Sequence, residues 1–164
     1  MDLEALAKHR EAELIVGFFE LMGYSKWCED RPPHEELALA AALFNCAGHA
    51  IANADGVLIK AMGDAGLFVF PTYDPDRAVL ALRAMKRDCD GWLSERGYPD
   101  VISVKLQVGA VACGKVGPPS DACIDVCGMT VNRAARMRGR AFAVSADARR
   151  GLSQLNDDEF VADD

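Results

Sequence analysis

The sequence lacks the features that mark membrane, secreted and repetitive proteins. No apolar run approaches the roughly 18 residues that a membrane-spanning helix needs. The first residues, MDLEALAKHREAE, are too acidic and polar for a signal or transit peptide. No internal repeat, low-complexity tract or linker interrupts the chain. These absences predict a single domain over residues 1–164 that has no membrane span and lies in the cytoplasm.

Basic residues are scarce relative to acidic ones. The 164 residues include 18 Lys and Arg against 25 Asp and Glu, which gives a formal net charge of −7. A chain with this balance lacks the basic surface that a nucleic-acid backbone requires, so we exclude nucleic acid as a partner.

Cysteine spacing excludes the common metal sites. Of the six cysteines, only Cys123 and Cys127 form a tight pair, with no second pair and no histidine at zinc-ligand spacing. We expect reduced, partly buried thiols without a metal or redox role.

What the chain does contain is a regular alternation of strand and helix patterns. This order predicts an α+β fold, with a ferredoxin-like βαββαβ core, helices on one face of an antiparallel sheet, and a C-terminal βαβα extension. The segments expected for the core are a buried strand and turn over 12–25, a helix from Pro32 and Pro33 to Asp55 and Gly56, a hairpin over 56–70, a helix over 74–97, and one long strand or two over 101–117. The segments expected for the extension are a strand that turns into a helix at Gly128 over 123–137, a strand over 141–145, and a helix over 145–155 capped by Ser145.

Two carboxylates occupy positions that this sheet would bring together. Glu20 interrupts the first apolar strand near its end, where burial without a partner would be costly. Asp64 lies at the turn of the hairpin, shortly after Lys60. The first strand of a βαββ unit lies beside the hairpin, so both carboxylates reach one sheet edge and suit Mg²⁺ held with substrate phosphates. The alternative is a solvated strand end and an ordinary turn residue.

A second polar group surrounds Gly128. Asn132 and Arg136 share a face of the expected helix, and Asp125 precedes them on the incoming strand. An amide, a guanidinium and a carboxylate at one site suit a ribose, a phosphate and a base amino group. A polar helix face with surface ion pairs is the alternative interpretation.

Four stretches, taken in order, carry a family resemblance: FFELMGYS, GVLIKAMGDAGLFVF, LQVGAVACGKVG and IDVCGMTVNRAARM. Together they resemble the motifs of class III nucleotidyl cyclases, the adenylate and guanylate cyclase family. FFELMGYS resembles the family pattern F-x-D-[IL]-x-G-[FY]-[ST], and GVLIKAMGDAGLFVF resembles its G-x-x-x-K-x-x-G-D hairpin. LQVGAVACGKVG resembles its glycine-bounded arm, and IDVCGMTVNRAARM resembles D-x-x-G-x-x-V-N-x-A-[AS]-R. The resemblance covers residues 18 to about 145 and implies the nucleotide cyclase fold.

The resemblance also implies an activity and an assembly. The implied enzyme is an adenylate cyclase, a lyase of cyclic nucleotide signalling that converts ATP into 3′,5′-cyclic AMP and pyrophosphate. It would work as a head-to-tail homodimer, with metal carboxylates from one chain and base-reading and transition-state residues from the other. The implied roles are two Mg²⁺ or Mn²⁺ ions held by Glu20 and Asp64, adenine recognition by Lys60 and Asp125, ribose orientation by Asn132, and stabilisation of charge on the α-phosphorus by Arg136.

The chain departs from the family pattern at two places. Glu20 stands where the family has Asp, and a displacement of about 1 Å can lower a rate by on the order of a hundredfold. No Lys follows Lys115, so we expect the family's C-terminal hairpin, with its phosphate-binding Lys, to be missing. Two alternatives therefore stay open. One is a cyclase-homology module that binds nucleotide or dimerises without turnover, and the other is a cyclase acting on GTP or a pyrimidine nucleotide.

Overall fold

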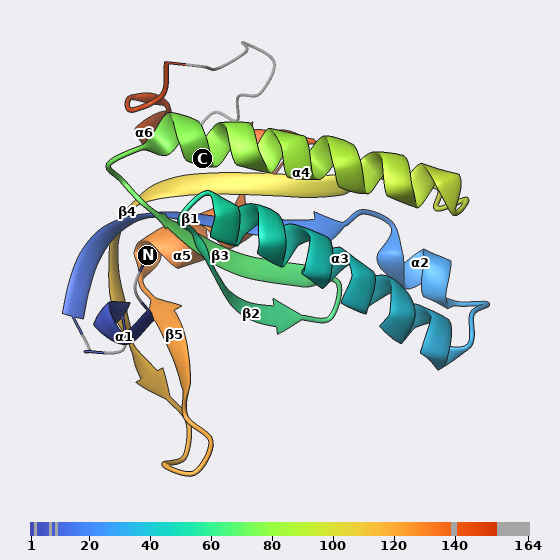
Figure 1. The fold of residues 1–164 in the computed structure, drawn as a ribbon, viewed down its shortest axis with the longest axis horizontal. Helices are drawn as coiled ribbons and strands as arrows, with labels where there is room; N and C mark the ends of the chain where they lie inside the picture. Colours follow the sequence, from blue (N-terminus) through green and yellow to red (C-terminus); the bar gives the residue numbers. More distant parts are fainter. Residues whose placement is uncertain (2, 7, 9, 139–140, 154–164) are drawn as a thin grey trace.

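The computed structural model describes residues 1, 3–6, 8, 10–138 and 141–153, which form one six-stranded sheet with helices on both faces (Figure 1). The strands are β1 (Arg10–Leu21), β2 (Val57–Met62), β3 (Ala65–Pro71), β4 (Ile102–Val116), β5 (Cys123–Cys127) and β6 (Phe142–Val144). The helices are α1 (Leu3–Leu6), α2 (Tyr24–Cys28), α3 (Pro33–Asn53), α4 (Pro75–Glu95), α5 (Met129–Arg136) and α6 (Ala146–Arg149).

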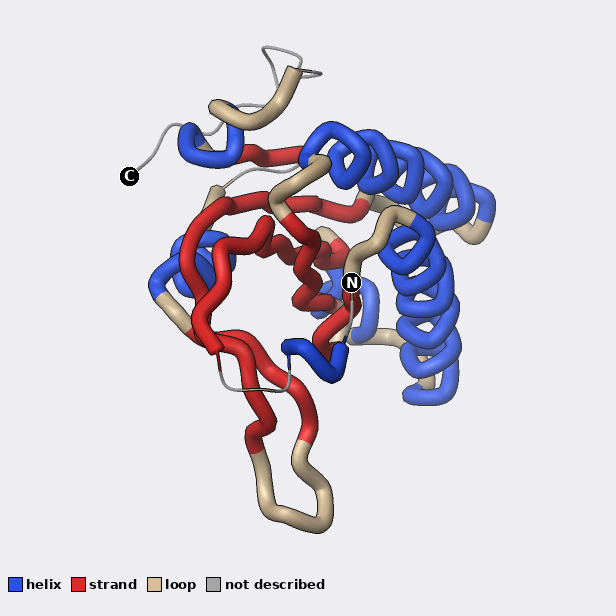
Figure 2. Tube along the Cα trace, turned by 60° about the vertical axis from the view of Figure 1, so that its left-hand side comes forward, coloured by secondary structure: helices blue, strands red, loops and turns tan. Residues whose placement is uncertain are grey.

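The sheet has the strand order of the expected ferredoxin-like core. The order is β2-β3-β1-β4-β5 with antiparallel neighbours, and β6 pairs parallel with β4. β4 is one strand of 15 residues that pairs with both β1 and β5, which decides between the one-strand and two-strand expectations. Figure 2 shows that the sheet is curled, so β2 and β5 contact each other although they lie at opposite ends of the order.

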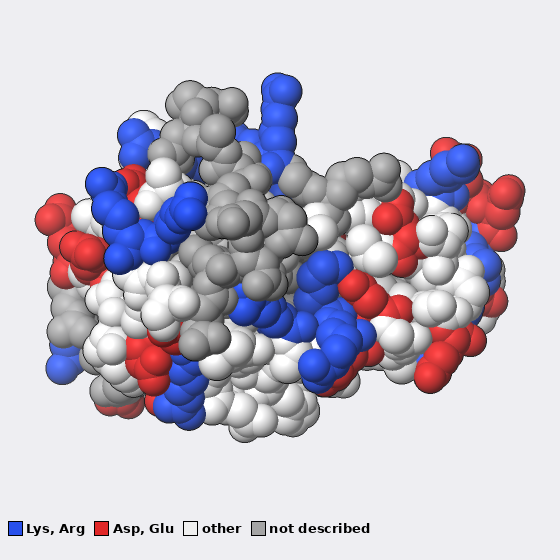
Figure 3. All heavy atoms as spheres, turned by 90° about the horizontal axis from the view of Figure 1, so that it is seen from above, with Lys and Arg blue, Asp and Glu red and all other residues white. Residues whose placement is uncertain are grey.

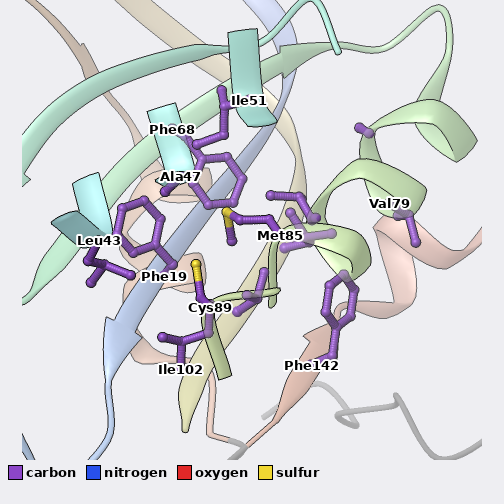
Figure 4. Packing of buried hydrophobic residues seen from close by; sticks show 14 of the residues in the cluster. Phe19, Leu43, Ala47, Ile51, Phe68, Val79, Met85, Cys89, Ile102 and Phe142 are labelled. Carbon is purple, nitrogen blue, oxygen red and sulfur yellow. The ribbon is translucent and has the colours of Figure 1, made fainter. Parts of the chain in front are cut away.

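α3 and α4 cover one face of the sheet. Each helix has a proline in its first turn, and the Asp74 side chain accepts a hydrogen bond from the Arg77 backbone N–H (3.2 Å) at the start of α4. We call the apolar cluster beneath them the helix-side core; Figure 4 shows part of it. Its members include Phe19, Leu43, Phe68, Met85, Cys89 and Ile102.

The opposite face carries a second cluster, which lies under α1 and α5. Leu6 of α1 and Ala134 of α5 pack there against side chains of β1, β2, β3, β4 and β5. The expectation of helices on one face therefore holds for the βαββαβ part, whereas α5 of the extension packs on the other face.

Alternation along β1 divides its side chains between the two clusters. Ile15 and Phe19 belong to the helix-side core, whereas Leu14 and Val16 belong to the second cluster. Glu20 is an even number of residues from Leu14 and Val16, so its side chain lies on the same face as theirs, away from α3 and α4.

Two helices and one boundary differ from the sequence-based expectation. Neither α1 nor α2 was expected. α2 has five residues and follows Gly23, which has a φ of 71°. A glycine with this conformation is typical of a turn, and the sequence predicted only a turn here. α6 ends at Arg149, although its predicted cap is present as a hydrogen bond from the Ala148 N–H to the Ser145 hydroxyl (3.1 Å). Residues 154–155 of the expected helix lie outside the described residues. So does the chain that follows them, for which we expected the family's C-terminal hairpin to be missing.

On the face seen in Figure 3, acidic and basic side chains lie side by side in several places, and uncharged surface separates these places.

Within the described ranges, no helix combines the length and apolar character that crossing a membrane requires.

Candidate functional site

Glu20 and Asp64 lie in one pocket at an end of the sheet. Glu20 is opposite Ala65 of β3 and Ser103 of β4, and Asp64 occupies the turn between β2 and β3. Both line a pocket of about 380 Å³, which we call the carboxylate pocket; residues 21–26 form its other walls. The structure thus brings together the two carboxylates that the sequence assigns to separate segments.

The carboxylate pocket makes the charged form of Asp64 less favourable than it is in water. Burial raises the pKa of the Asp64 carboxyl, and the negative charge of Glu20 raises it further. A divalent cation would relieve this repulsion, because hard cations bind carboxylate oxygens. The described residues contain no group of three or more His, Cys, Asp or Glu side chains placed to hold a metal. The two carboxylates therefore fit an ion whose remaining ligands come from substrate phosphates and water.

Lys60 and Asp125 form an ion pair between β2 and β5. The Lys60 Nζ lies 2.6 Å from Asp125 Oδ2, although 65 residues separate them in sequence. The Val126 backbone N–H donates to the other carboxylate oxygen of Asp125 (2.8 Å) and so fixes its orientation. The Lys60 and Asp125 side chains are 41% and 20% exposed, so a ligand can reach both.

α5 presents Asn132 and Arg136 to solvent. Ala134 is buried on the other side of this helix, and the Thr130 hydroxyl donates to the Ala110 carbonyl (2.8 Å), which ties α5 to β4. Asn132 and Arg136 are exposed one turn apart. In the part of the chain that the structure describes, no hydrogen bond or ion pair joins either side chain to the carboxylate pocket. The candidate residues thus fall into two groups, one in the carboxylate pocket and one around β5 and α5.

Comparison with known proteins gives the following similarities. No family model matches the chain. A curated protein named adenylate cyclase, from Anabaena cylindrica, is 30% identical over 134 residues, which cover 77% of this chain and 27% of that protein. Among solved structures, a bacterial light-regulated adenylyl cyclase superposes with a TM-score of 0.79 at 21% identity, over 89% of this chain and 46% of that one. The guanylate cyclase domain of RhGC from Catenaria anguillulae, in complex with GTP, superposes with a TM-score of 0.72 at 19% identity, over 87% and 83%.

The chain has the fold of a class III nucleotidyl cyclase catalytic domain. The resemblance carried by the four sequence motifs is thereby confirmed. The chain spans about a quarter of the length of the curated adenylate cyclase and about half of the light-regulated one.

One residue that sequence interpretation missed contacts the carboxylate pocket of this cyclase fold. The Lys105 Nζ lies 2.7 Å from Glu20 Oε1, and the Lys105 side chain is only 10% exposed. Lys105 is opposite Phe18 in the pairing of β4 with β1, whereas Glu20 is opposite Ser103, so the ion pair is a diagonal contact on one sheet face. Its only signal in the sequence is a charged residue inside the apolar strand ISVKLQV.

The wall of the carboxylate pocket that α2 forms was also missed. Burial, together with a hydrogen bond to Cys28, raises the pKa of Tyr24 to about 12, so its phenol is uncharged at neutral pH. The Tyr98 hydroxyl donates to the Met22 carbonyl (2.8 Å) and holds the segment between β1 and α2. The α2 wall therefore places the uncharged phenol of Tyr24, together with Lys26, beside the two carboxylates.

Proposed function

We propose that the chain is a class III nucleotidyl cyclase that converts ATP into 3′,5′-cyclic AMP and pyrophosphate as a homodimer. The observation that carries the proposal is the contact between Lys60 and Asp125, two motif residues that meet at 2.6 Å. An ammonium beside a carboxylate presents a donor next to an acceptor, which complements a ring nitrogen and an exocyclic amine of adenine. The name of the curated relative, adenylate cyclase, supports the same base.

The ion pair leaves enough hydrogen-bonding capacity for this role. A lysine ammonium has three donors and a carboxylate has several acceptor positions, and their mutual contact uses one of each. Lys60 and Asp125 can therefore hold each other in place and still bind a base.

Glu20 and Asp64 are the proposed ligands of two divalent ions, Mg²⁺ or Mn²⁺, that bind with the triphosphate. When bound, the ions supply charge neutralisation at the phosphates. The longer Glu20 side chain shifts its oxygens from the positions of an Asp, and Mg²⁺ demands near-ideal octahedral geometry. We therefore expect a higher rate with Mn²⁺ than with Mg²⁺.

Asn132 and Arg136 are proposed to act on the ribose and the α-phosphorus. The Asn132 amide orients the ribose so that its 3′-oxygen is in line with the α-phosphorus. The Arg136 guanidinium stabilises the charge that develops as this oxygen attacks and pyrophosphate leaves. Since no hydrogen bond or ion pair joins either side chain to the carboxylate pocket among the described residues, we assign both to a site that the partner subunit completes.

A second candidate function is a nucleotide-binding module without turnover. The observation that favours it is Lys105, whose ammonium at 2.7 Å gives Glu20 the positive partner that a metal ion would otherwise supply. The chain also keeps Arg136, which turnover needs and nucleotide binding does not, and this favours the enzyme.

Incubation of the purified chain with each of the four nucleoside triphosphates, in Mg²⁺ or Mn²⁺, tests the proposal. The expected result is cyclic AMP as the main product, formed faster in Mn²⁺. Cyclic GMP or a cyclic pyrimidine nucleotide as the main product would reassign the base. Nucleotide binding without any cyclic product would support the module instead.

A further inference from the structure

Two cysteines from different helices touch each other beside the helix-side core. The Sγ atoms of Cys46 in α3 and Cys89 in α4 lie 3.2 Å apart, although 43 residues separate them in sequence. Both are free thiols. A disulfide has a sulfur–sulfur distance of about 2.05 Å, so a movement of about 1 Å would allow a bond to form.

The two thiols differ in their access to solvent. Cys46 is exposed, whereas Cys89 is 1% exposed and lies in the helix-side core near Phe19 and Ile102 (Figure 4). Burial raises the pKa of the Cys89 thiol, and the contact with Cys46 raises it further. Cys89 is therefore protonated at neutral pH, and Cys46 is the thiol that an oxidant in solution reaches first.

We propose that Cys46 and Cys89 are a peroxide-sensitive pair that closes to a disulfide between α3 and α4. In the first step the Cys46 thiolate attacks an oxygen of hydrogen peroxide, the O–O bond breaks, and Cys46 sulfenic acid and hydroxide form. In the second step the Cys89 sulfur attacks the Cys46 sulfur, and the leaving hydroxide combines with the Cys89 proton to give water. The thiols lose two electrons in total, and the peroxide gains the same two.

This proposal is independent of the proposed cyclase activity, because neither cysteine lies in the carboxylate pocket or on α5. It departs from the sequence-based expectation of thiols without a redox role. Sequence spacing could not suggest the pairing, because the contact depends on how α3 packs against α4. A bond closing a 43-residue separation restricts the unfolded chain and should raise the melting temperature.

Peptide mapping of the full chain can detect the bond directly. The chain is treated with hydrogen peroxide, its remaining thiols are alkylated, and it is digested with trypsin and a glutamate-specific protease. This digestion places Cys28, Cys46 and Cys89 on the separate peptides 27–29, 37–60 and 88–95. The expected product joins 37–60 to 88–95 and disappears when a dithiol reductant is added.

Cys46→Ser is the test variant, because the exposed position leaves the helix-side core unchanged. Cys123→Ser is its matched control, since Cys123 is also exposed but lies outside the pair. Peroxide should produce the linked peptide, and raise Tm by about 5–15 °C, in the wild type and in Cys123→Ser but not in Cys46→Ser. Three outcomes would overturn the proposal. The thiols stay unreacted, Cys46 is oxidised further while Cys89 stays a free thiol, or disulfides form mainly between other cysteines.

Discussion

Lys105 is the side chain whose role separates a cyclase from a binding module. Its ammonium is largely shielded from water, whereas its partner Glu20 is 35% exposed. The ion pair is therefore partly screened and weaker than a fully buried one. To bind a divalent ion, Glu20 must either release Lys105 or use its second carboxylate oxygen. Lys105 thus restrains the long Glu20 side chain and competes with cations for its charge.

Replacing Lys105 by Met keeps most of the apolar stem and removes the competing charge. We expect Lys105→Met to bind Mn²⁺ about three- to tenfold more tightly than the wild type in the absence of nucleotide. Isothermal titration calorimetry measures this directly. Lys115→Met is the matched control, since Lys115 is an exposed lysine of the same strand. Weaker Mn²⁺ binding in Lys105→Met would mean that Lys105 positions Glu20 for the metal instead of competing with it.

Arg136 is proposed to meet charge that exists only in the transition state. Loss of such an interaction lowers the rate and leaves ground-state binding nearly intact. Arg136→Ala should therefore cyclise ATP about a hundred- to a thousandfold more slowly, with nucleotide affinity within a few-fold of the wild type. Rates of product formation and equilibrium nucleotide binding provide the two measurements. Arg133→Ala, an exposed neighbour on α5, should keep the wild-type rate. A large loss of affinity in Arg136→Ala would assign the guanidinium to ground-state binding.

At the scale of elements, β1 and β3 can pair closely because Gly66 has no side chain. Gly66 is opposite Phe19, and a Cβ at Gly66 would lie 2.3 Å from Cζ of the Phe19 ring. That ring is fully buried, with centroids 5.5 Å from Phe44 and 6.2 Å from Phe68. The next pair along these strands is Glu20 with Ala65, so this packing lies directly beside the strand end that carries Glu20.

Gly66→Ala should lower the free energy of unfolding by about 1–3 kcal/mol, because the added methyl must displace Phe19 from a close-packed position. Urea denaturation of the variant measures the change. Gly91→Ala is a control with the opposite expectation. Gly91 is exposed on α4 with no atom within 4 Å of an added Cβ, so alanine should stabilise the helix by up to about 1 kcal/mol. Equal stability of Gly66→Ala and the wild type would mean that the Phe19 ring has room to turn aside.

The long elements could be predicted because their periodicity extends over many residues. α3 and α4 repeat apolar residues at helical spacing between clear start and stop signals, and β1 and β4 are long apolar runs. The position of Glu20 beside Asp64 followed from the expected βαββ order, because that order places β1 next to the hairpin. α2 could not be predicted, since five residues behind a left-handed glycine carry no helical period.

Side-chain contacts between distant segments were beyond sequence reasoning. The pairing of Lys105 with Glu20 depends on the register of β4 against β1, and a shift of one residue would turn Lys105 to the other face. The contact of Cys46 with Cys89 likewise depends on the packing of two helices. In contrast, the cation and the carboxylate at Lys60 and Asp125 were predicted to share a function from motif resemblance, and the structure places them in contact.

At the scale of the whole molecule, the division of the candidate residues into two groups determines what one chain can do. The carboxylate pocket lies at one end of the sheet, and Asn132 and Arg136 lie on α5 with no hydrogen bond or ion pair to it in the described part of the chain. In a two-fold symmetric dimer, the pocket of each subunit can face α5 of the other, which gives two equivalent composite sites. A chain that stays monomeric at tens of micromolar, with and without nucleotide, would contradict the catalytic proposal.

Mixing two inactive variants tests whether the sites are shared between subunits. Asp64→Asn removes a proposed metal ligand, and Arg136→Ala removes the proposed transition-state group, so each homodimer has two defective sites. A mixed dimer concentrates both defects in one site and leaves the other site intact. Random exchange of subunits makes about half of the dimers mixed, so activity should recover to about a quarter of the wild-type rate.

The control for this experiment mixes Asp64→Asn with Glu20→Gln, whose defects lie in the same pocket and leave no intact site in a mixed dimer. This pair should recover no activity, although its subunits exchange equally well by mass spectrometry of a tagged chain. Equal recovery in both mixtures would show that the two groups are not divided between subunits. No recovery in either, with exchange demonstrated, would place both groups in a site formed by a single chain.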